Sequence, residues 1–204
     1  MDEKYSLAQL QALSPKTARS IQRETVSSYA DFIELLYQDL DELISDIQEN
    51  PEKRNGDDED RLTIEIRTVL RQLGWEATHD EKLGGHTDLT VRKKSYTWIG
   101  EAKIHNGSEY LWGGFQQLTT RYSVGSHNQS EGGLIIYIKS ENALLVMQRW
   151  RQGLRNRGLE DFVDCDCEAN PLAFFSSHKH MRSGLPFKVR HIPIMLFFDP
   201  QDKK

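Results

Sequence analysis

Residues 84–103 constrain the fold of this chain more than any other stretch. Two runs rich in β-branched and aromatic residues, 88–91 and 96–104, flank a short charged segment at 92–95. Such residues favour strands, and a short polar segment between two strands predicts a β-hairpin. We therefore expect a hairpin here, with the other elements packed around it.

Three polar side chains interrupt this otherwise apolar hairpin: Asp88 in the first strand, and Glu101 and Lys103 in the second. Side chains alternate between the two faces of a strand, so Glu101 and Lys103 point the same way, about 6.6 Å apart along the backbone. A buried carboxylate is costly unless it is paired or bound to a cation. Two carboxylates and a lysine on one sheet face therefore indicate a divalent-metal site with a cation beside it.

The arrangement resembles the PD-(D/E)XK nuclease superfamily, whose members share the restriction-endonuclease-like fold. The first half-motif is Gly85-His86-Thr87-Asp88, in which Thr87 stands at the family's loosely kept proline position, and the second is Glu101-Ala102-Lys103. The resemblance extends roughly over residues 57–139. It implies an α/β fold in which a mixed β-sheet is flanked by helices, preceded in this chain by an N-terminal helical extension.

The resemblance also implies a chemistry, the Mg²⁺- or Mn²⁺-dependent hydrolysis of phosphodiester bonds, with DNA favoured over RNA as the substrate. Asp88, Glu101 and the carbonyl group of Ala102 would hold one or two ions, since hard cations prefer oxygen ligands. A bound ion lowers the pKa of a water molecule and neutralises charge on the phosphate. Lys103 would position that water and stabilise the transition state. The protein is thus expected to be a metal-dependent DNA endonuclease.

A purely structural interpretation of the second half-motif is an ion pair between Glu101 and Lys103 on an exposed strand face. An exposed pair contributes only about 0–1 kcal/mol to stability. It also gives no reason for Asp88 to interrupt the preceding strand, so we favour the metal site.

A helix is predicted ahead of the hairpin. The acidic run 57–60 favours a helix N-terminus, and Gly74 ends the helix. Its buried stripe consists of Leu62, Ile66, Val69, Leu70 and Leu73. Glu65 flanks that stripe, and in the resembled family a glutamate of this helix often completes the acidic cluster. We choose Glu65 as this catalytic and metal-binding residue, with Glu59 as the second choice and a solvated surface position as the alternative.

A second helix should follow the hairpin, after Ser108. Gln117 falls where exonuclease-like branches of the family carry a glutamine close to the site, which implies a catalytic role. In those branches a tyrosine comes four residues later, whereas here Arg121 is four residues and Tyr122 five residues after Gln117. An ordinary exposed glutamine is therefore an equal alternative.

The run 132–138 predicts a strand buried on both faces, and residues 142–157 predict a helix after it. The outward face of that helix is basic, with Arg149, Arg151, Arg155 and Arg157. Such a face would track the phosphates of a nucleic acid, or it is simply solvated. Further strands are expected within residues 161–176 and 187–198.

Charge is unevenly distributed along the chain, whose net charge is −5. Residues 1–60 hold 15 acidic and 6 basic residues, a net of −9, whereas residues 61–204 hold 16 acidic and 20 basic, a net of +4. The acidity therefore belongs to the N-terminal region, and the remainder suits a nucleic-acid partner better. We divide the chain into an N-terminal helical assembly region, 1–55, and a nuclease domain, 56–204.

The N-terminal region presents an apolar stripe of eight large residues between Tyr29 and Ile47. Ser14-Pro15 predicts the start of a helix, which would be about 50 Å long if it ran unbroken to Glu49. A helix of that length would overhang a domain of this size, so the stripe predicts a homo-oligomer or a partner-protein interface. The alternative is a helical hairpin packed on the nuclease core, with Leu7, Leu10 and Leu13 on its first helix.

Two cysteines cannot form a disulfide framework, and no apolar run approaches the length of a membrane span. We therefore expect a cytoplasmic protein with no membrane partner. The remaining cluster is Cys165, Cys167, His178 and His180, for which buried reduced cysteines are favoured over a zinc site because the spacing matches no usual zinc loop. His86 and His105 are weaker candidates for contacts near the acidic residues.

Two function classes stay open. The first is an active nuclease, for example an effector subunit of an antiphage defence system that works under the control of a partner. The second is a catalytically silent binding or scaffold subunit of a nucleic-acid-processing complex. The intact Asp88…Glu101-x-Lys103 pattern favours the first, while sequence specificity and the choice between endo- and exonuclease cannot be read from the chain.

Overall fold

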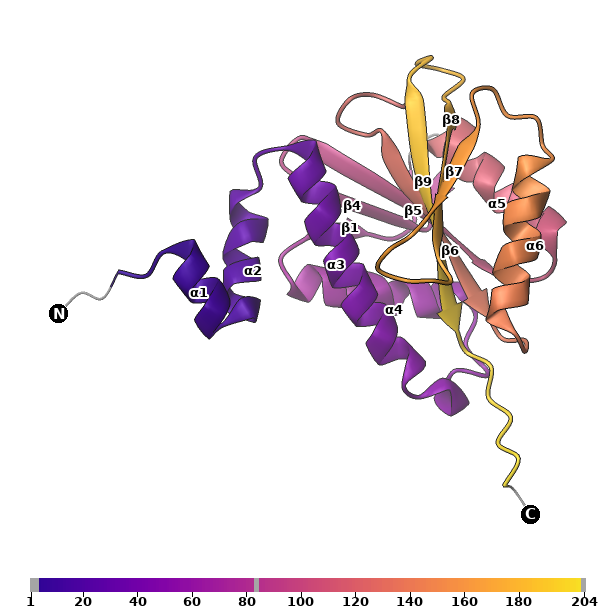
Figure 1. The fold of residues 1–204 in the computed structure, drawn as a ribbon, viewed down its shortest axis with the longest axis horizontal. Helices are drawn as coiled ribbons and strands as arrows, with labels where there is room; N and C mark the ends of the chain where they lie inside the picture. The colour runs from indigo at the N-terminus through magenta and orange to yellow at the C-terminus, as the bar shows by residue number, and fades with distance from the viewer. Residues whose placement is uncertain (1–3, 83–84, 203–204) are drawn as a thin grey trace.

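The predicted hairpin is present in the computed structural model, which describes residues 4–82 and 85–202 (Figure 1). Strands β4 (Leu89–Lys93) and β5 (Tyr96–Ile104) pair antiparallel. The turn between them is tighter than expected, only Lys94 and Ser95, and Lys94 takes a positive φ of 56°. Asp88 lies in a bend just before β4 rather than inside the strand. Gly84, the first residue of the stretch singled out above, lies outside the described residues.

The hairpin forms one side of a mixed sheet, which has seven strands in the described part of the chain, in the order β1-β4-β5-β6-β9-β8-β7. The central strands β5, β6 and β9 run parallel, and all other neighbours pair antiparallel. The further strands of this sheet are β1 (Glu76–Thr78), β6 (Glu131–Ile138), β7 (Val163–Asp166), β8 (Phe174–Lys179) and β9 (Pro186–Met195). A small separate ribbon is formed by β2 (Glu81–Lys82) and β3 (His86–Thr87).

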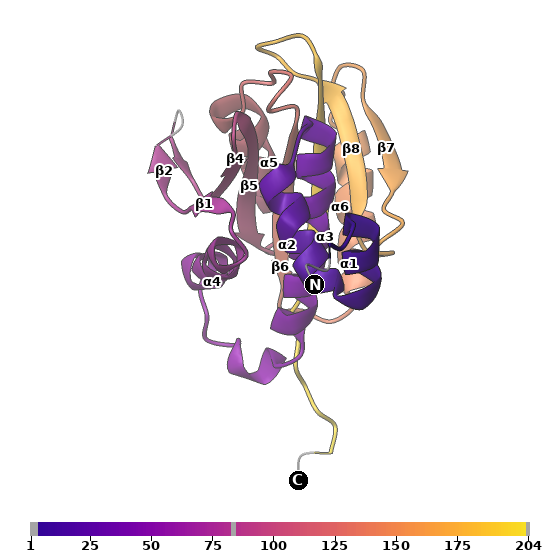
Figure 2. The ribbon, with the colours of Figure 1, turned by 90° about the vertical axis from the view of Figure 1, so that its left-hand side faces the viewer.

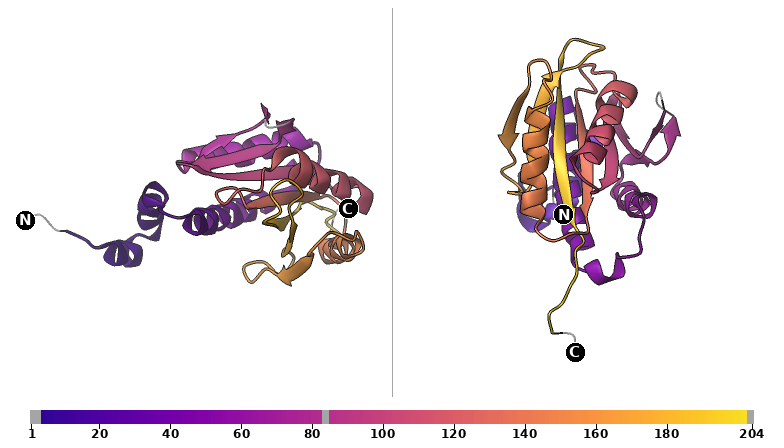
Figure 3. Two further views of the ribbon diagram at one scale, coloured as in Figure 1. Left: turned by 90° about the horizontal axis from the view of Figure 1, so that it is seen from above. Right: turned by 90° about the vertical axis from the view of Figure 1, so that its right-hand side faces the viewer.

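Helices cover both faces of the sheet, as expected for a mixed α/β fold. One face packs against α3 (Tyr29–Gln48) and α4 (Glu59–Gln72), and the other against α5 (Ser108–Gln116) and α6 (Ala143–Arg155). Figures 2 and 3 show these two layers from opposite sides of the molecule. A π-helical segment, η2 (Gln117–Tyr122), extends α5, and a short 3₁₀ turn, η1 (Pro51–Lys53), precedes α4.

The N-terminal region does not form one long helix. Helices α1 (Leu7–Leu13) and α2 (Pro15–Thr25) come before α3, and residues 26–28 interrupt the path between α2 and α3. The physical reason is local, because Ser28 caps α3 by accepting a hydrogen bond at Oγ from the Asp31 N–H, at 3.1 Å. A serine in the extended conformation at this position starts a new helix rather than continuing the old one. Figure 1 shows α1 and α2 projecting away from the sheet.

The apolar stripe of α3 is covered within the chain itself. Phe32, Leu36 and Leu40 are fully buried, in one core with Trp98 and Ile135 of the sheet. The expectation that this stripe mediates self-association is therefore wrong, because the sheet already covers it. A glutamate at position 32 or 36 would bury a charge in this core and would unfold the chain rather than separate a dimer. Helix α3 also shares its core with the sheet across the division drawn at residue 55.

Helix α2 is held against α3 by a buried ion pair. Arg23 Nη1 donates to the Asp39 carboxylate at 3.0 and 3.1 Å, and Trp75 Nε1 donates to Asp39 Oδ2 at 2.7 Å. Arg23 and Asp39 are 5% and 2% exposed, so removing either partner would leave an uncompensated charge.

Among the described residues, no helix combines the length and apolarity needed to cross a bilayer.

Acid should destabilise this fold through His191, which is fully buried between α6 and β8. Its Nδ1 accepts a hydrogen bond from Trp150 Nε1 at 3.0 Å, so Nε2 carries the proton and donates to Ser176 Oγ at 2.8 Å. Burial lowers the pKa of His191 to about 3. The unfolded chain therefore binds more protons below pH 6.5, and stability falls from there towards pH 3.

We expect His191 alone to cost the fold about 2 kcal/mol between pH 7 and pH 5. Urea unfolding of wild type and His191→Asn at both pH values tests this. The variant should be less stable at pH 7 yet lose less stability on acidification, whereas the exposed-site control His127→Asn should follow wild type. An equal pH dependence in His191→Asn and wild type would contradict the assignment.

Candidate active site

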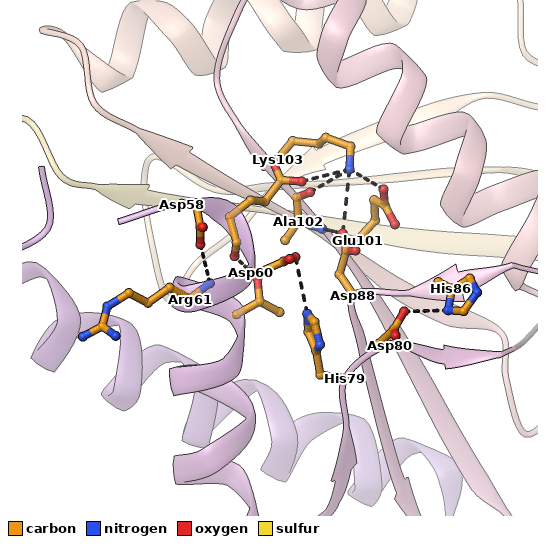
Figure 4. A network of polar contacts seen from close by, with 12 residues as sticks. Asp58, Asp60, Arg61, His79, Asp80, His86, Asp88, Glu101, Ala102 and Lys103 are labelled. Atoms are coloured by element: carbon orange, nitrogen blue, oxygen red, sulfur yellow. Dashed lines mark hydrogen bonds and ion pairs between the residues drawn. The ribbon is translucent and has the colours of Figure 1, made fainter. Parts of the chain in front are cut away.

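The ammonium group of Lys103 lies at the centre of a cluster of oxygen atoms (Figure 4). Its Nζ is 2.6 Å from Glu101 Oε1, 2.9 Å from the Ala102 carbonyl oxygen, 3.3 Å from Glu59 Oε1 and 3.7 Å from Asp88 Oδ2. The structure therefore brings together Asp88, Glu101, Ala102 and Lys103, the residues of the two predicted half-motifs. It adds Glu59, the second choice for the helical acid.

The end of the β4–β5 ladder explains why these carboxylates converge. Pairing between the two strands stops at Gly100, so the next N–H groups on that edge of β5 lack a partner in β4. Asp88 Oδ2 accepts from the Ala102 N–H, and Glu59 Oε2 accepts from the Ile104 N–H, both at 2.8 Å. Because backbone donors must be satisfied when they are not exposed to water, the frayed ladder positions both acids beside Lys103.

Asp88, Glu101, Ala102, Lys103 and Glu59 together form what we call the acidic centre, and Glu101 is its most deeply buried carboxylate. It is 1% exposed, and its Oε2 has no hydrogen-bond partner among the described residues. Burial raises the pKa of Glu101 to about 8, and the negative charges of Asp88 and Glu59 add to this effect against the opposing influence of Lys103. Burial alone would lower the pKa of Lys103, but the three carboxylates outweigh it and raise that pKa above its usual value. The cluster thus has more acidic groups than one ammonium group neutralises.

These residues fit a hard divalent cation. The available donors are all oxygens, three carboxylates and one carbonyl, which is the ligand type that Mg²⁺ and Mn²⁺ prefer. The unpartnered Oε2 of Glu101 is a further oxygen that a cation would satisfy. As the side chains stand, no three His, Cys, Asp or Glu residues in the described part of the chain are arranged to hold a metal ion. At this centre the Lys103 ammonium group lies among the oxygens.

Glu65, the first choice for the helical acid, lies elsewhere. Its carboxylate binds Arg54, with Nη2 donating to Oε1 at 2.6 Å. Glu59 and Glu65 are six residues apart, and at about 100° per residue they project from different sides of α4. The phase of this helix therefore brings Glu59, in its first turn, to the end of β5 and turns Glu65 away.

Gln117 is half-buried at the start of η2, and no hydrogen bond or ion pair joins it to the acidic centre in the described residues. The π-helix nevertheless explains why Tyr122 comes five residues after Gln117 instead of four. The Ser123 N–H donates to the Leu118 carbonyl group at 3.1 Å, an i to i+5 bond. One added residue per turn moves position i+5 to where an α-helix has i+4. Tyr122 therefore lies on the same side of the helix as Gln117, one turn later. Burial and the negative charges of Glu101 and Asp88 raise the pKa of Tyr122.

The predicted basic face of residues 142–157 is largely neutralised by neighbouring acids, and α6 ends at Arg155, so Arg157 lies just beyond the helix. Arg151 and Arg155 both bind Asp164, at 2.6 and 2.7 Å, and Arg151 also binds Asp166. Arg157 binds Glu109 and lies over the Trp112 ring at 4.8 Å. Arg149 is exposed. The sequence shows the arginines but not the distant acids that engage three of them, so the face offers phosphates less charge than expected.

The other candidates lie apart from the acidic centre. His86 pairs with Asp80 at 2.6 Å rather than with Asp88, and His105 is half-buried at the end of β5. The proposed zinc ligands do not form a metal cluster in the described part of the chain. Cys165 is exposed, whereas Cys167 is buried and contacts Arg190. His178 and His180 are both buried, and His180 forms a hydrogen bond with Ser123. Of the two cysteines, which are both free, only Cys167 is buried as expected.

Comparison with protein-family models, with curated proteins and with solved structures finds no match for this chain.

Proposed function

We propose that the protein is a divalent-metal-dependent nuclease and that the acidic centre around Lys103 is its active site. The observation that carries the proposal is the convergence of three carboxylates and a carbonyl oxygen on one lysine, with Glu101 buried and one of its oxygens unpartnered. Perturbed ionisable groups of this kind are characteristic of functional sites. The resemblance of the two half-motifs to PD-(D/E)XK nucleases supports the same assignment.

Asp88, Glu101, Glu59 and the Ala102 carbonyl group would hold the ion. When bound, Mg²⁺ supplies a water molecule of lowered pKa and neutralises charge on the phosphate. Lys103 would then donate hydrogen bonds from its ammonium group to the oxygens that gain negative charge in the transition state. The hydrogen bonds from the Ala102 and Ile104 N–H groups fix the Asp88 and Glu59 carboxylates, so these two ligands need little movement to bind an ion.

A second candidate is a binding subunit that uses this fold without catalysis. The observation that favours it is that Lys103 Nζ lies 2.6 to 3.7 Å from three carboxylates, so that the ammonium group balances part of the acidic charge. The two proposals differ in what a divalent ion should do to the protein.

Purified protein incubated with plasmid, linear duplex and single-stranded DNA tests the nuclease proposal. We expect cleavage in Mg²⁺ or Mn²⁺, none in EDTA, and loss of cleavage in Glu101→Gln, a change that keeps the shape of the side chain. Calorimetric titration with Mn²⁺ should show binding to wild type and much weaker binding to Glu101→Gln. Cleavage that persists in EDTA, or a wild type that neither binds Mn²⁺ nor cleaves, would overturn the proposal and favour the binding subunit.

A further inference from the structure

Tyr110 is an exposed aromatic residue beside the acidic centre. Its side chain is 45% exposed, and its ring centroid lies 6.0 Å from Lys103 Nζ. Large aromatic side chains contribute most to stability when they are buried, so the fold gains little from this one. An aromatic ring next to a phosphate-reactive centre is suited to stacking against a nucleobase.

On the helix face that carries Tyr110, the next two residues of α5 are glycines, Gly113 and Gly114. Tyr110, Gly113, Gly114 and Gln117 follow the i, i+3, i+4, i+7 spacing and so share one face of the helix. Gly114 is required by packing, because a Cβ there would lie 2.8 Å from Lys103 Cγ. A Cβ at Gly113 would have no atom within 4 Å, so protein packing does not explain that glycine. Glycine weakens a helix interior, and one use of it is the close approach of a ligand to the backbone.

The acidic centre is also recessed. The side chains of Glu101 and Lys103 are 1% and 11% exposed, while those of Asp88 and Glu59 are 23% and 25% exposed. The Glu101–Lys103 pair is therefore less accessible to a phosphate than Asp88 and Glu59 are. The phosphates of a duplex are fixed on a stiff double helix, whereas a single strand bends freely and its bases are free to stack on protein rings.

We propose that the substrate is single-stranded nucleic acid, with one unpaired base stacked on Tyr110 and the adjacent backbone passing over Gly113. This inference rests on the proposed function, since it takes the acidic centre as the place where the phosphate binds. Tyr110 is a positioning residue for that phosphate. The half-buried Gln117 lies at the far end of the same helix face and marks the direction in which the strand continues.

Fluorescence anisotropy measures this binding without turnover when Ca²⁺, which also takes oxygen ligands but is larger than Mg²⁺, replaces the catalytic ion. The probes are a labelled oligothymidine, an oligouridine of the same length, and a labelled duplex. We expect wild type to bind single strands more tightly than duplex. Tyr110→Ala should weaken single-strand binding about 5- to 150-fold, the range for losing one base–aromatic stack, with little change for duplex.

Two further variants separate stacking from structural damage. Tyr110→Phe keeps the ring and should bind single strands like wild type, and Gly113→Leu should block them while Mn²⁺ binding stays unchanged. Equal binding of single strands and duplex by wild type, or equal losses in Tyr110→Ala and Tyr110→Phe, would overturn the inference. Tyr110-dependent binding without cleavage in Mg²⁺ would instead remove the nuclease proposal and leave the single-strand site. Cleavage of duplex that is insensitive to Tyr110→Ala would remove the single-strand inference and leave the nuclease proposal.

Discussion

Replacing Lys103 by methionine should lower the rate of DNA cleavage about 100- to 1,000-fold and raise the affinity for Mn²⁺ about tenfold. The loss of rate reflects the removal of one charged donor from the transition state. The gain in affinity follows from the contacts of Nζ, which lies within 3.7 Å of all three carboxylates and 2.9 Å from the Ala102 carbonyl oxygen. An ion must displace this ammonium group to reach the oxygens. Methionine removes that competition while filling a similar volume.

Opposite changes in rate and affinity distinguish this role of Lys103 from simple damage to the site. Cleavage is measured under single-turnover conditions, and Mn²⁺ binding by calorimetry. The matched control is Lys53→Met, an exposed lysine in η1 that should behave like wild type in both assays. Thermal melts should show Lys103→Met gaining more from Mn²⁺ than wild type does, since Glu101 has lost its ion partner. A variant that binds Mn²⁺ more weakly would show that Lys103 supports the metal site rather than competing for it.

The hairpin and its polar residues were predictable because their information is local. Alternation along β5 alone fixes Glu101 and Lys103 on one face, and the polar interruptions of an apolar hairpin mark the site. The mixed sheet with flanking helices follows from the succession of strand and helix patterns. The position of Tyr110 beside the centre was not predicted, because one exposed aromatic in a helix gives no periodic signal.

The misplaced features depend on tertiary contacts. The stripe of α3 is correctly apolar, but its pattern does not say whether the sheet or a second chain covers Phe32 and Leu36. The arginines of α6 project outward as expected, yet Asp164 reaches two of them from a strand that follows the helix. The spacing from Gln117 to Tyr122 appeared irregular because a π-helix is not visible in a residue pattern. For α3 and α6 the local pattern was right and the partner was unknown, whereas for Gln117 the helix type itself was unknown.

The choice between Glu59 and Glu65 leads to the second large expected effect. Replacing Glu59 by glutamine should weaken Mn²⁺ binding and lower the cleavage rate by at least about 100-fold, because it removes one negative charge from the acidic centre. Its Oε1 lies 3.3 Å from Lys103 Nζ, and its Oε2 accepts from the Ile104 N–H at 2.8 Å. Glutamine keeps one oxygen for the backbone bond, so the fold should be preserved and the effect confined to charge.

Glu65→Gln is the matched control, since it makes the same chemical change on the same helix. Glu65 binds the half-buried Arg54 away from the acidic centre, and glutamine keeps an oxygen for that contact, so this variant should retain wild-type cleavage and Mn²⁺ binding. Cleavage assays and calorimetry on the two variants side by side decide the assignment. A loss of activity in Glu65→Gln with none in Glu59→Gln would mean that α4 rotates when the substrate binds. Equal, full activity in both would remove α4 from the site and leave Asp88 and Glu101 as its only carboxylates.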